Sequence, residues 1–226
     1  MHKVVRHIKR PDPEVVKTLE ALGTATISEA QGRRGLLNPC MRPIYPSARM
    51  CGPAVTALCQ PGDNMMIHAA IEVSQPGDVM VVAVTSESTD GYFGELLGTS
   101  LQAHGLKGLI LDAGCRDVME LTAMGFPVWS KCISAQGTVK ETPGSVNIPV
   151  VCANQLVRPG DVIMADIDGV VVVPREDAAA VAKAGLDRVA KEEKTRARLK
   201  NGELGMNFNG IREKLAAMGV VYVDEE

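Results

Sequence analysis

Continuous apolar runs that follow short turns constrain the fold of this chain most. Residues 79–84 and 162–165 each follow a Pro-Gly-Asp tripeptide, and residues 109–111 follow a segment with a glycine at each end. Because these runs lack polar alternation, they predict strands that are covered on both faces, as in the centre of an α/β sheet. Residues 92–104 have the spacing of a crossover helix. Residues 79–111 are therefore predicted to form a strand–helix–strand unit.

The remaining segments predict helices at both ends of the chain and more strands between them. Residues 14–22 have helical spacing and end at Gly23, and a second helix is expected over 27–31 behind a Thr24 or Thr26 cap. Further helices are predicted over 175–201 and 208–218, where the first is long and rich in Ala, Lys, Glu and Arg. Additional strands are predicted over 54–58, 127–129, 146–151 and 170–173.

Length and charge narrow the class of protein. A chain of 226 residues is compatible with one compact unit, so 1–226 is predicted to be a single α/β domain. The net charge of −3 and the lack of a basic stripe argue against nucleic acid as a partner. The first residues contain no apolar leader, and no stretch of about 18 apolar residues occurs, so we expect a cytoplasmic protein without a membrane span.

The six cysteines are scattered and form no C-x-x-C pair. This spacing favours neither a disulfide framework nor a zinc ribbon. We expect reduced and mostly buried thiols.

The first candidate site is the glycine-rich loop 90–98, which contains Gly94, Glu95 and Gly98 between a strand and a helix. Free amides at a helix N-terminus attract anions, and the glycines would let a small carboxylate approach the backbone. An equally weighted alternative is an ordinary turn in which Glu95 complements the helix dipole. No nucleotide-binding glycine signature is present.

The second candidate site is Arg116-Asp117 at the end of the next strand. Arginine holds a carboxylate with two hydrogen bonds, and aspartate supplies a hard oxygen ligand for Mg²⁺. Taken alone, the sequence Asp117-Val118-Met119-Glu120 favours a helix cap with Arg116 in a surface ion pair, because caps outnumber metal sites.

The two loops together, in the order Gly-Glu-Leu-Leu-Gly, crossover helix, strand, Asp-Ala-Gly-Cys-Arg-Asp, resemble the class II pyruvate aldolases. Those enzymes cleave 4-hydroxy-4-methyl-2-oxoglutarate and 4-carboxy-4-hydroxy-2-oxoadipate. The likeness extends through residues 41–46, 61–64, 125–131 and 136–140. The RraA-type regulators of ribonuclease E share the two loops less completely.

The resemblance implies an α/β fold with a swivelling β/β/α core, a long C-terminal helix, and a homotrimer or homohexamer with sites between subunits. It assigns Asp117 as the ligand of a Mg²⁺ or Mn²⁺ ion. Arg116 would contact the keto or carboxylate oxygen of a 2-oxo acid, next to Gly94, and the amides of Leu96 and Leu97 would hold its carboxylate.

Two further carboxylates are implied as catalytic groups. Glu95 stands where many family members have Asp, and it is a candidate for the proton shuttle. A glutamate from the long C-terminal helix of a neighbouring subunit would complete the site, with Glu192 preferred and Glu193 as its rival. Both could instead be solvated and paired with Lys or Arg at i+3 or i+4.

The implied reaction is a metal-dependent retro-aldol cleavage to pyruvate plus oxaloacetate or a second pyruvate, in aromatic-acid catabolism, with oxaloacetate decarboxylation as a side activity. One alternative is a Schiff-base aldolase that uses Lys107, Lys131 or Lys140. Another is a non-catalytic regulator that binds a ribonuclease in the manner of RraA. Residues proposed to distinguish the substrates are Arg33, Arg34 and Arg42.

Overall fold

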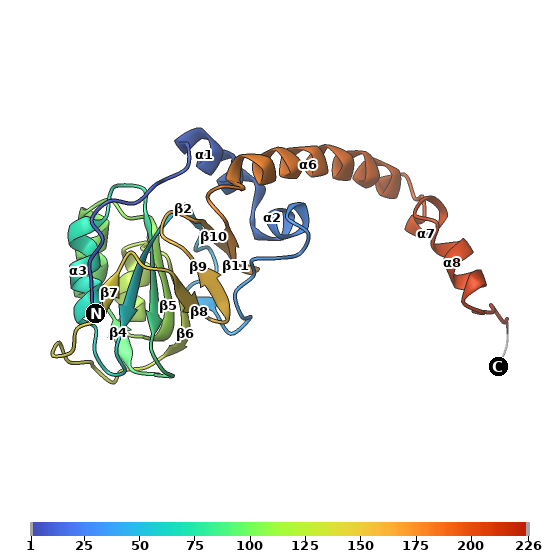
Figure 1. The fold of residues 1–226 in the computed structure, drawn as a ribbon. Helices are drawn as coiled ribbons and strands as arrows, with labels where there is room; N and C mark the ends of the chain where they lie inside the picture. The colour runs from blue at the N-terminus through green and yellow to red at the C-terminus, as the bar shows by residue number, and fades with distance from the viewer. Residues whose placement is uncertain (1, 225–226) are drawn as a thin grey trace. The chain divides into compact units, whose positions relative to one another are not determined.

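A computed structural model describes residues 2–224 of the chain. The chain divides between Gly185 and Leu186 into two units, which are described separately. The first unit holds every strand that the structure describes, and the second consists of helices and a terminal segment (Figure 1). The prediction of a single domain over 1–226 stays a prediction.

The first unit is built on a mixed sheet with the strand order β1-β6-β5-β3-β2-β10-β11. The central strands β2, β3, β5 and β6 pair in parallel, whereas β1, β10 and β11 add to the edges in antiparallel fashion. The bounds of these strands are β1 Arg42–Pro43, β2 Met50–Cys59, β3 Val79–Val84, β5 Gly108–Cys115, β6 Val128–Ile133, β10 Val162–Asp166 and β11 Gly169–Val173.

Four short strands complete the architecture. Strand β4 (Gly91–Phe93) pairs with β5, and β7 (Ser145–Val146) pairs with β2. Strands β8 (Val150–Cys152) and β9 (Gln155–Val157) form a separate hairpin. The predicted strand over 146–151 is therefore two strands, separated at Asn147, whose φ is +56°.

The alternating side chains of β3 explain why its sequence is an unbroken apolar run. Met80 and Val82 pack on one side with helices α3 (Met65–Val73) and α4 (Glu95–Ala103). Val79 and Val81 pack on the opposite side with the β8–β9 hairpin and β10. Burying each such side chain contributes about 1.5–3 kcal/mol. Because both faces are covered, neither face tolerates polar residues, as the sequence predicted.

A third apolar cluster lies at the β10–β11 end of the sheet. Helices α1 (Pro13–Leu22) and α2 (Thr24–Ala30) pack there with the first turns of α6 (Ala178–Lys200). The helix predicted over 27–31 begins earlier, and its N-cap is Gly23 rather than a threonine. The Thr24 hydroxyl is not a cap, because it donates to Asp166 on β10 and ties α2 to the sheet.

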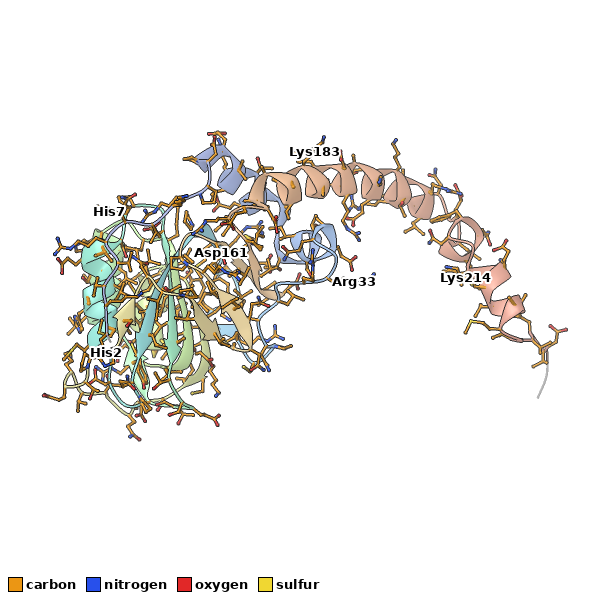
Figure 2. All side chains as sticks on the ribbon, viewed as in Figure 1. His2, His7, Arg33, Asp161, Lys183 and Lys214 are labelled. Carbon is orange, nitrogen blue, oxygen red and sulfur yellow. The ribbon has the colours of Figure 1, made fainter. Side chains whose placement is uncertain are left out.

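The three Pro-Gly-Asp turns mark element boundaries, as predicted. They precede α3, β3 and β10, and their aspartates Asp63, Asp78 and Asp161 are buried. In Figure 2, Asp161 lies among the packed side chains of the first unit rather than at its rim.

The crossover between β3 and β5 differs from its prediction at one end. Residues 92–104 were expected to be helical throughout, but Gly91–Phe93 is strand β4 and the helix α4 begins only at Glu95. Tyr92 and Phe93 are buried in the core, and the strand pairing of this segment uses its backbone groups. The early strand places the loop at Gly94 directly beside the end of β5.

The second unit begins within the long helix α6, which confirms the helix predicted over 175–201. The helix predicted over 208–218 is α8 (Ile211–Ala217), which begins later than expected because Gly210 adopts φ +62° and separates it from the short helix α7 (Gly205–Phe208). Within the described part of this unit, α7 and α8 bury no side chain. Among residues 2–224, no helix is both long and apolar enough to span a bilayer.

Candidate active site

Strand pairing brings the two predicted loops together. Gly91 of β4 pairs with Gly114 of β5, and Phe93 pairs with Cys115. The amide of Arg116 then donates to the carbonyl of Phe93 at 2.9 Å. The loop that follows β4 and the loop that follows β5 therefore form one corner of the sheet, as the sequence predicted.

Asp117 does not act as the cap of its own helix. It occupies the N-cap position of α5 (Val118–Ala123) in a left-handed conformation, with φ +54° and ψ +40°. Within the described residues its carboxylate caps no amide of α5, so the D-x-x-E cap alternative is wrong. Instead, Asp117 Oδ2 accepts a hydrogen bond from the amide of Glu95 at 3.0 Å, 22 residues earlier in the chain.

The left-handed backbone of Asp117 redirects its side chain toward α4. Non-glycine residues in this region carry a conformational cost of about 1–3 kcal/mol, and such strain is concentrated at functional sites. Asp117 thus joins the start of α5 to the start of α4 through a single carboxylate oxygen. Its side chain remains 41% exposed, and the contacts with the Glu95 amide and Arg116 Nε both use Oδ2.

Gly94 is required by the position of Asp117. Its backbone is extended, so the glycine is not needed for an unusual φ. A Cβ atom at this position would lie 2.2 Å from Asp117 Oδ2 and 3.0 Å from Cγ of Arg116. We expected Gly94 to let a ligand approach the backbone. In the structure, the Asp117 carboxylate occupies the space beside this glycine.

The amides of Leu96 and Leu97 lie in the first turn of α4. Because the helix begins at Glu95, these amides have no acceptor four residues earlier within it. Leu97 is buried in the core, which holds the turn in place, while the Leu96 side chain projects into solvent. The turn therefore presents backbone donors at the corner that contains Asp117.

The Glu95 carboxylate does not point at Asp117. Its Oε1 accepts a hydrogen bond from the Thr99 hydroxyl at 2.7 Å, one turn further along α4. The contact with Asp117 is made by the Glu95 backbone instead. A role for this carboxylate in proton transfer stays a prediction, and it requires a side-chain rotation away from Thr99.

Arg116 extends over a third loop, at Gln136 and Gly137, which we had not predicted to be part of the site. Its Nε lies 3.8 Å from Asp117 Oδ2, and its side chain is 45% exposed. A Cβ atom on Gly137 would lie 3.0 Å from Nη1 of Arg116. The loop is held there because the Gly91 amide donates to the Gln136 carbonyl at 2.6 Å.

A cavity of about 390 Å³ opens beside Arg116 and Asp117. Its wall is completed by the first turn of α5 and by the segment after β6, through Val118, Met119, Glu120, Ile133, Ser134 and Ala135. The contribution of Ile133 and Ser134 was missed. The signal in the sequence was the strand predicted at 127–129. In the structure this strand continues to Ile133, which pairs with Cys115.

The donor set of this corner fits a hydrated hard cation. Across the described part of the chain, no three His, Cys, Asp or Glu side chains gather closely enough to enclose a metal ion. Mg²⁺ in proteins is commonly held by one or two carboxylates, with waters and substrate oxygens completing the octahedron. The partly exposed Asp117 carboxylate is suited to that arrangement, in which most ligands of the ion come from water and substrate.

Glu192 and Glu193 belong to the second unit, whereas the corner belongs to the first. Glu192 forms an ion pair with Arg188 at 2.7 Å, and Glu193 forms one with Arg196. Both glutamates therefore have the i,i+3 or i,i+4 partners that the sequence left open as an alternative. A contribution of either residue to a neighbouring subunit stays a prediction.

None of the candidate lysines provides a desolvated amine. The carboxylate of Glu87 accepts from Lys131 Nζ at 2.8 Å and raises the pKa of that lysine. A Schiff-base nucleophile needs the opposite shift. Lys107 and Lys140 are exposed, and Lys107 precedes β5, at the other end of the strand from Arg116.

The candidate specificity arginines contact other parts of the chain. Arg33 pairs with Glu29 at 3.0 Å, Arg34 donates to the Gln31 carbonyl at 3.0 Å, and Arg42 reaches the carbonyls of residues 167–168. None of the three lines the cavity beside Asp117.

A larger cavity of about 470 Å³ lies among α2, β11 and α6. Its buried carboxylate, Asp161, already accepts from the amides of Arg158 and Arg175. Both oxygens of Asp161 are therefore already hydrogen-bonded, so this carboxylate is less available to a ligand than that of Asp117.

Sequence comparisons connect this geometry to known proteins. The RraA-like family model, described as Aldolase/RraA, matches residues 24–172. A Halalkalibacterium halodurans protein named "Putative 4-hydroxy-4-methyl-2-oxoglutarate aldolase" is 28% identical over 162 residues, which cover 72% of this chain and 77% of the relative. A Burkholderia multivorans protein of the same name is 32% identical over 143 residues, covering 63% and 87%.

The fold also matches a solved structure. The crystal structure of Streptomyces coelicolor RraAS2, described as an unusual member of the RNase ES inhibitor RraA protein family, aligns with a TM-score of 0.76 and 29% identity. The alignment covers 84% of this chain and 99% of that chain. The predicted fold, an RraA-like α/β core with a long C-terminal helix, is confirmed.

Proposed function

This chain belongs to the RraA-like family of aldolases and RraA proteins, and from that premise we propose that it is a divalent-metal-dependent carbon–carbon lyase. The proposed substrates are 4-carboxy-4-hydroxy-2-oxoadipate and 4-hydroxy-4-methyl-2-oxoglutarate. Retro-aldol cleavage yields pyruvate together with oxaloacetate or a second pyruvate. Oxaloacetate decarboxylation is the expected side activity, because it leaves electrons on the same type of pyruvyl fragment.

The observation that carries the proposal is the hydrogen bond between Asp117 Oδ2 and the Glu95 amide. It uses one carboxylate oxygen to lock the corner and leaves the other free for a cation. It also sets Arg116 and the first turn of α4 around the same space, since Arg116 Nε lies 3.8 Å from that oxygen. A purely structural cap would have bonded its own helix instead.

The binding of the pyruvyl end follows from these positions. The amides of Leu96 and Leu97 would hold the substrate C1 carboxylate at the helix N-terminus, where the helix dipole favours an anion. The guanidinium of Arg116 would contact the C2 keto oxygen. Because arginine stays charged, it stabilises the negative charge that develops at that oxygen during cleavage.

Cleavage needs one proton removed and one delivered. A base takes the proton of the C4 hydroxyl, the C3–C4 bond breaks, and its electrons move to the pyruvyl fragment, whose C3 is then protonated. Glu95 is the candidate for this proton transfer from within the subunit, after it releases Thr99. Glu192 of a neighbouring subunit is the second candidate.

Asp117 would hold a Mg²⁺ or Mn²⁺ ion together with oxygens of the substrate and water. When bound, such an ion supplies Lewis acidity toward the keto acid, worth several kcal/mol of charge stabilisation. The chain contributes the single carboxylate and the neighbouring Arg116, and the rest of the coordination comes from outside the protein.

A neighbouring subunit is proposed to cover the corner. Leu96, Met119 and Ile133 are large apolar side chains exposed around the polar groups. Exposed apolar residues that surround a polar site are typical of a surface that another chain covers. A homotrimer or homohexamer would exclude water from the site and bring a glutamate such as Glu192 to it.

The test is pyruvate release from both substrates with Mg²⁺ or Mn²⁺ and after EDTA treatment. We expect activity that EDTA removes and either cation restores, and that Asp117→Ala abolishes. Pyruvate that borohydride traps on a lysine would contradict the metal mechanism and favour a Schiff base.

The similarity to the Streptomyces coelicolor RraA family member supports a second candidate, a non-catalytic ribonuclease regulator. A non-catalytic regulator would need neither a spare carboxylate oxygen on Asp117 nor the strained backbone that orients this side chain. Binding to a ribonuclease without turnover of either keto acid would reverse the order of the two proposals.

A further inference from the structure

A second cavity of the first unit offers charged groups that the proposed reaction does not use. It has a volume of about 470 Å³ and shares no lining residue with the cavity beside Asp117. Pockets that bind small molecules typically have volumes of about 300–1,000 Å³. The polar and charged residues that line it are Gln31, Arg34, Gln155, Arg158, Asp161 and Asp177. What the cavity can bind depends on which of these groups the fold already engages.

Arg34 lines the cavity with a guanidinium group that is held in place at one nitrogen. Its Nε donates to the Gln31 carbonyl at 3.0 Å, and Gln31 Nε2 donates to the Arg34 carbonyl at 2.6 Å. The loop itself is tied to β11, because the amide of Val172 donates to the carbonyl of Gly35 at 2.8 Å. No carboxylate in the described part of the chain pairs with Arg34. Its Nη1 and Nη2 therefore remain available to a ligand.

Arg158 provides a second unpaired guanidinium group at the turn between β9 and β10. The turn fixes its backbone, since the Arg158 amide donates to Asp161 Oδ2 at 2.8 Å and the Asp161 amide donates to the Arg158 carbonyl at 3.0 Å. Burial raises the pKa of Asp161, and the nearby positive charge of Arg158 opposes that rise. Among residues 2–224, the Arg158 side chain forms no ion pair or hydrogen bond. The cavity therefore has two cationic groups without a partner.

The acceptor groups of the cavity are also partly unused. Gln31 is buried, and its Nε2 donates to the carbonyls of Arg34 and Val172, which fixes the direction of its Oε1. Within the described residues, this Oε1 has no donor and is not sealed inside the core. Asp177, the residue before α6, is exposed, and its carboxylate has no partner in the same range. Asp161 differs, because both of its oxygens accept from backbone amides.

The unused groups of the cavity are thus two guanidinium groups, one carboxylate and one carboxamide oxygen. We propose that this cavity binds an acidic amino acid, which carries two carboxylates and one ammonium group. Arg34 and Arg158 would each hold one carboxylate with two parallel hydrogen bonds. The ammonium group would donate to the Asp177 carboxylate and to Gln31 Oε1.

The pattern of charges disfavours simpler ligands. An inorganic anion, or a dicarboxylate without an ammonium group, leaves Asp177 unpaired beside added negative charge. A neutral amino acid leaves one of the two guanidinium groups unpaired. Because unpaired polar groups in a binding site cost affinity, each of these ligands should bind more weakly than an acidic amino acid.

The test is isothermal titration calorimetry of the full-length chain with L-glutamate and L-aspartate, in EDTA so that no metal occupies the candidate active site. The comparison probes are 2-oxoglutarate, L-glutamine and inorganic phosphate. We expect saturable binding of at least one of the two amino acids, and binding of every comparison probe that is at least about tenfold weaker. The measurement involves no keto-acid cleavage, so its result does not depend on the proposed lyase activity.

Variants assign the groups that bind. Arg34→Gln and Arg158→Gln should each weaken binding by about 10- to 150-fold, and Asp177→Asn should remove the preference for glutamate over 2-oxoglutarate. The matched control is Arg33→Gln, which alters an arginine that pairs with Glu29 and does not line the cavity. No saturable binding of either amino acid, equal affinity for 2-oxoglutarate, or an equal loss in the control would overturn the proposal. Should a variant fail to fold, the ligand preference of the unmodified chain still decides.

Discussion

The three Pro-Gly-Asp turns and the Arg116–Asp117 corner place the same residue type at element boundaries, with opposite results. Asp63, Asp78 and Asp161 are at most 2% exposed, whereas the Asp117 side chain is 41% exposed. The Asp63 carboxylate accepts hydrogen bonds from three amides, those of Met65, Glu141 and Thr142. Asp117 accepts from the amide of Glu95, through Oδ2.

The difference separates structural carboxylates from one that is available for chemistry. Asp78 binds the guanidinium of Arg10 at 2.7 and 2.8 Å and also accepts from the Gln75 amide at 2.7 Å. Such saturated carboxylates hold distant segments together and have no capacity for a ligand. A carboxylate with a spare oxygen on a strained backbone has that capacity.

Replacing Asp117 by asparagine should have the largest effect. The amide oxygen can still accept from the Glu95 amide, and asparagine tolerates positive φ, so the free energy of unfolding should change by less than about 0.5 kcal/mol. The lost charge should lower kcat/KM for pyruvate release on the order of 10²–10³-fold. Steady-state kinetics and urea unfolding measure the two quantities.

The matched control for that variant is Asp63→Asn, which alters a saturated carboxylate. If Asp117→Asn destabilises the fold as much as Asp63→Asn and spares turnover, the distinction between the two regions is wrong.

Gly94→Ala should come next. The added Cβ would lie 2.2 Å from Asp117 Oδ2, so the carboxylate or the start of α4 must move. A displacement of about 1 Å at a reacting centre costs on the order of 10²-fold in rate. Kinetics of the purified variant check this, with Gly205→Ala as a control at a glycine where an added Cβ would meet only Asn209 Nδ2, at 3.5 Å. Full activity in Gly94→Ala would show that the corner is not positioned for catalysis.

Asp63→Asn should affect stability and its pH dependence. Burial acts to raise the pKa of Asp63, but the amide hydrogen bonds from Glu141, Met65 and Thr142 and the nearby Lys140 outweigh it and lower that pKa below 3.8. The stabilisation is therefore present above 3.8 and is lost as the pH falls through the lower folded-state value.

Asparagine supplies only one acceptor atom, so at least one donor is left unpaired, at a cost of about 1–3 kcal/mol at neutral pH. Urea unfolding from pH 7 to pH 2 should show the difference from the unmodified chain shrinking on the acid side. A difference that is constant across this range would contradict the assignment of Asp63 as an ionised structural carboxylate.

Thr99→Val should have the smallest effect, because it removes only the exposed hydrogen bond to Glu95. We expect a change in unfolding free energy within about 0.5 kcal/mol. If Glu95 transfers the proton only after leaving Thr99, kcat should stay equal or rise. A large fall in kcat would instead mean that Glu95 works in its present orientation.

The sequence predicted the parts of this site that depend on strand ends. Both loops follow apolar strands that lie beside each other in the sheet, so their proximity follows from α/β topology. The bond from the Glu95 amide to Asp117 could not be predicted, because it depends on the positive φ of Asp117 and the absence of a Cβ at Gly94. D-x-x-E caps are common, and the pattern alone favoured a cap.

Other differences have similarly local causes. Ile133 and Ser134 were missed because the polar residues Ser130 and Lys131 interrupt the apolar run after Trp129, although the strand continues to Ile133. The helix predicted over 208–218 begins only at Ile211, because Gly210 adopts a positive φ that helical spacing alone does not reveal.

The most direct test of the central claim is Mn²⁺ binding followed by electron paramagnetic resonance, in the presence of pyruvate, for the unmodified chain, Asp117→Asn and Asp63→Asn. We expect the unmodified chain and Asp63→Asn to bind Mn²⁺ with similar affinity, and Asp117→Asn to bind it at least about tenfold more weakly. Equal binding by all three would show that the spare oxygen of Asp117 holds no cation.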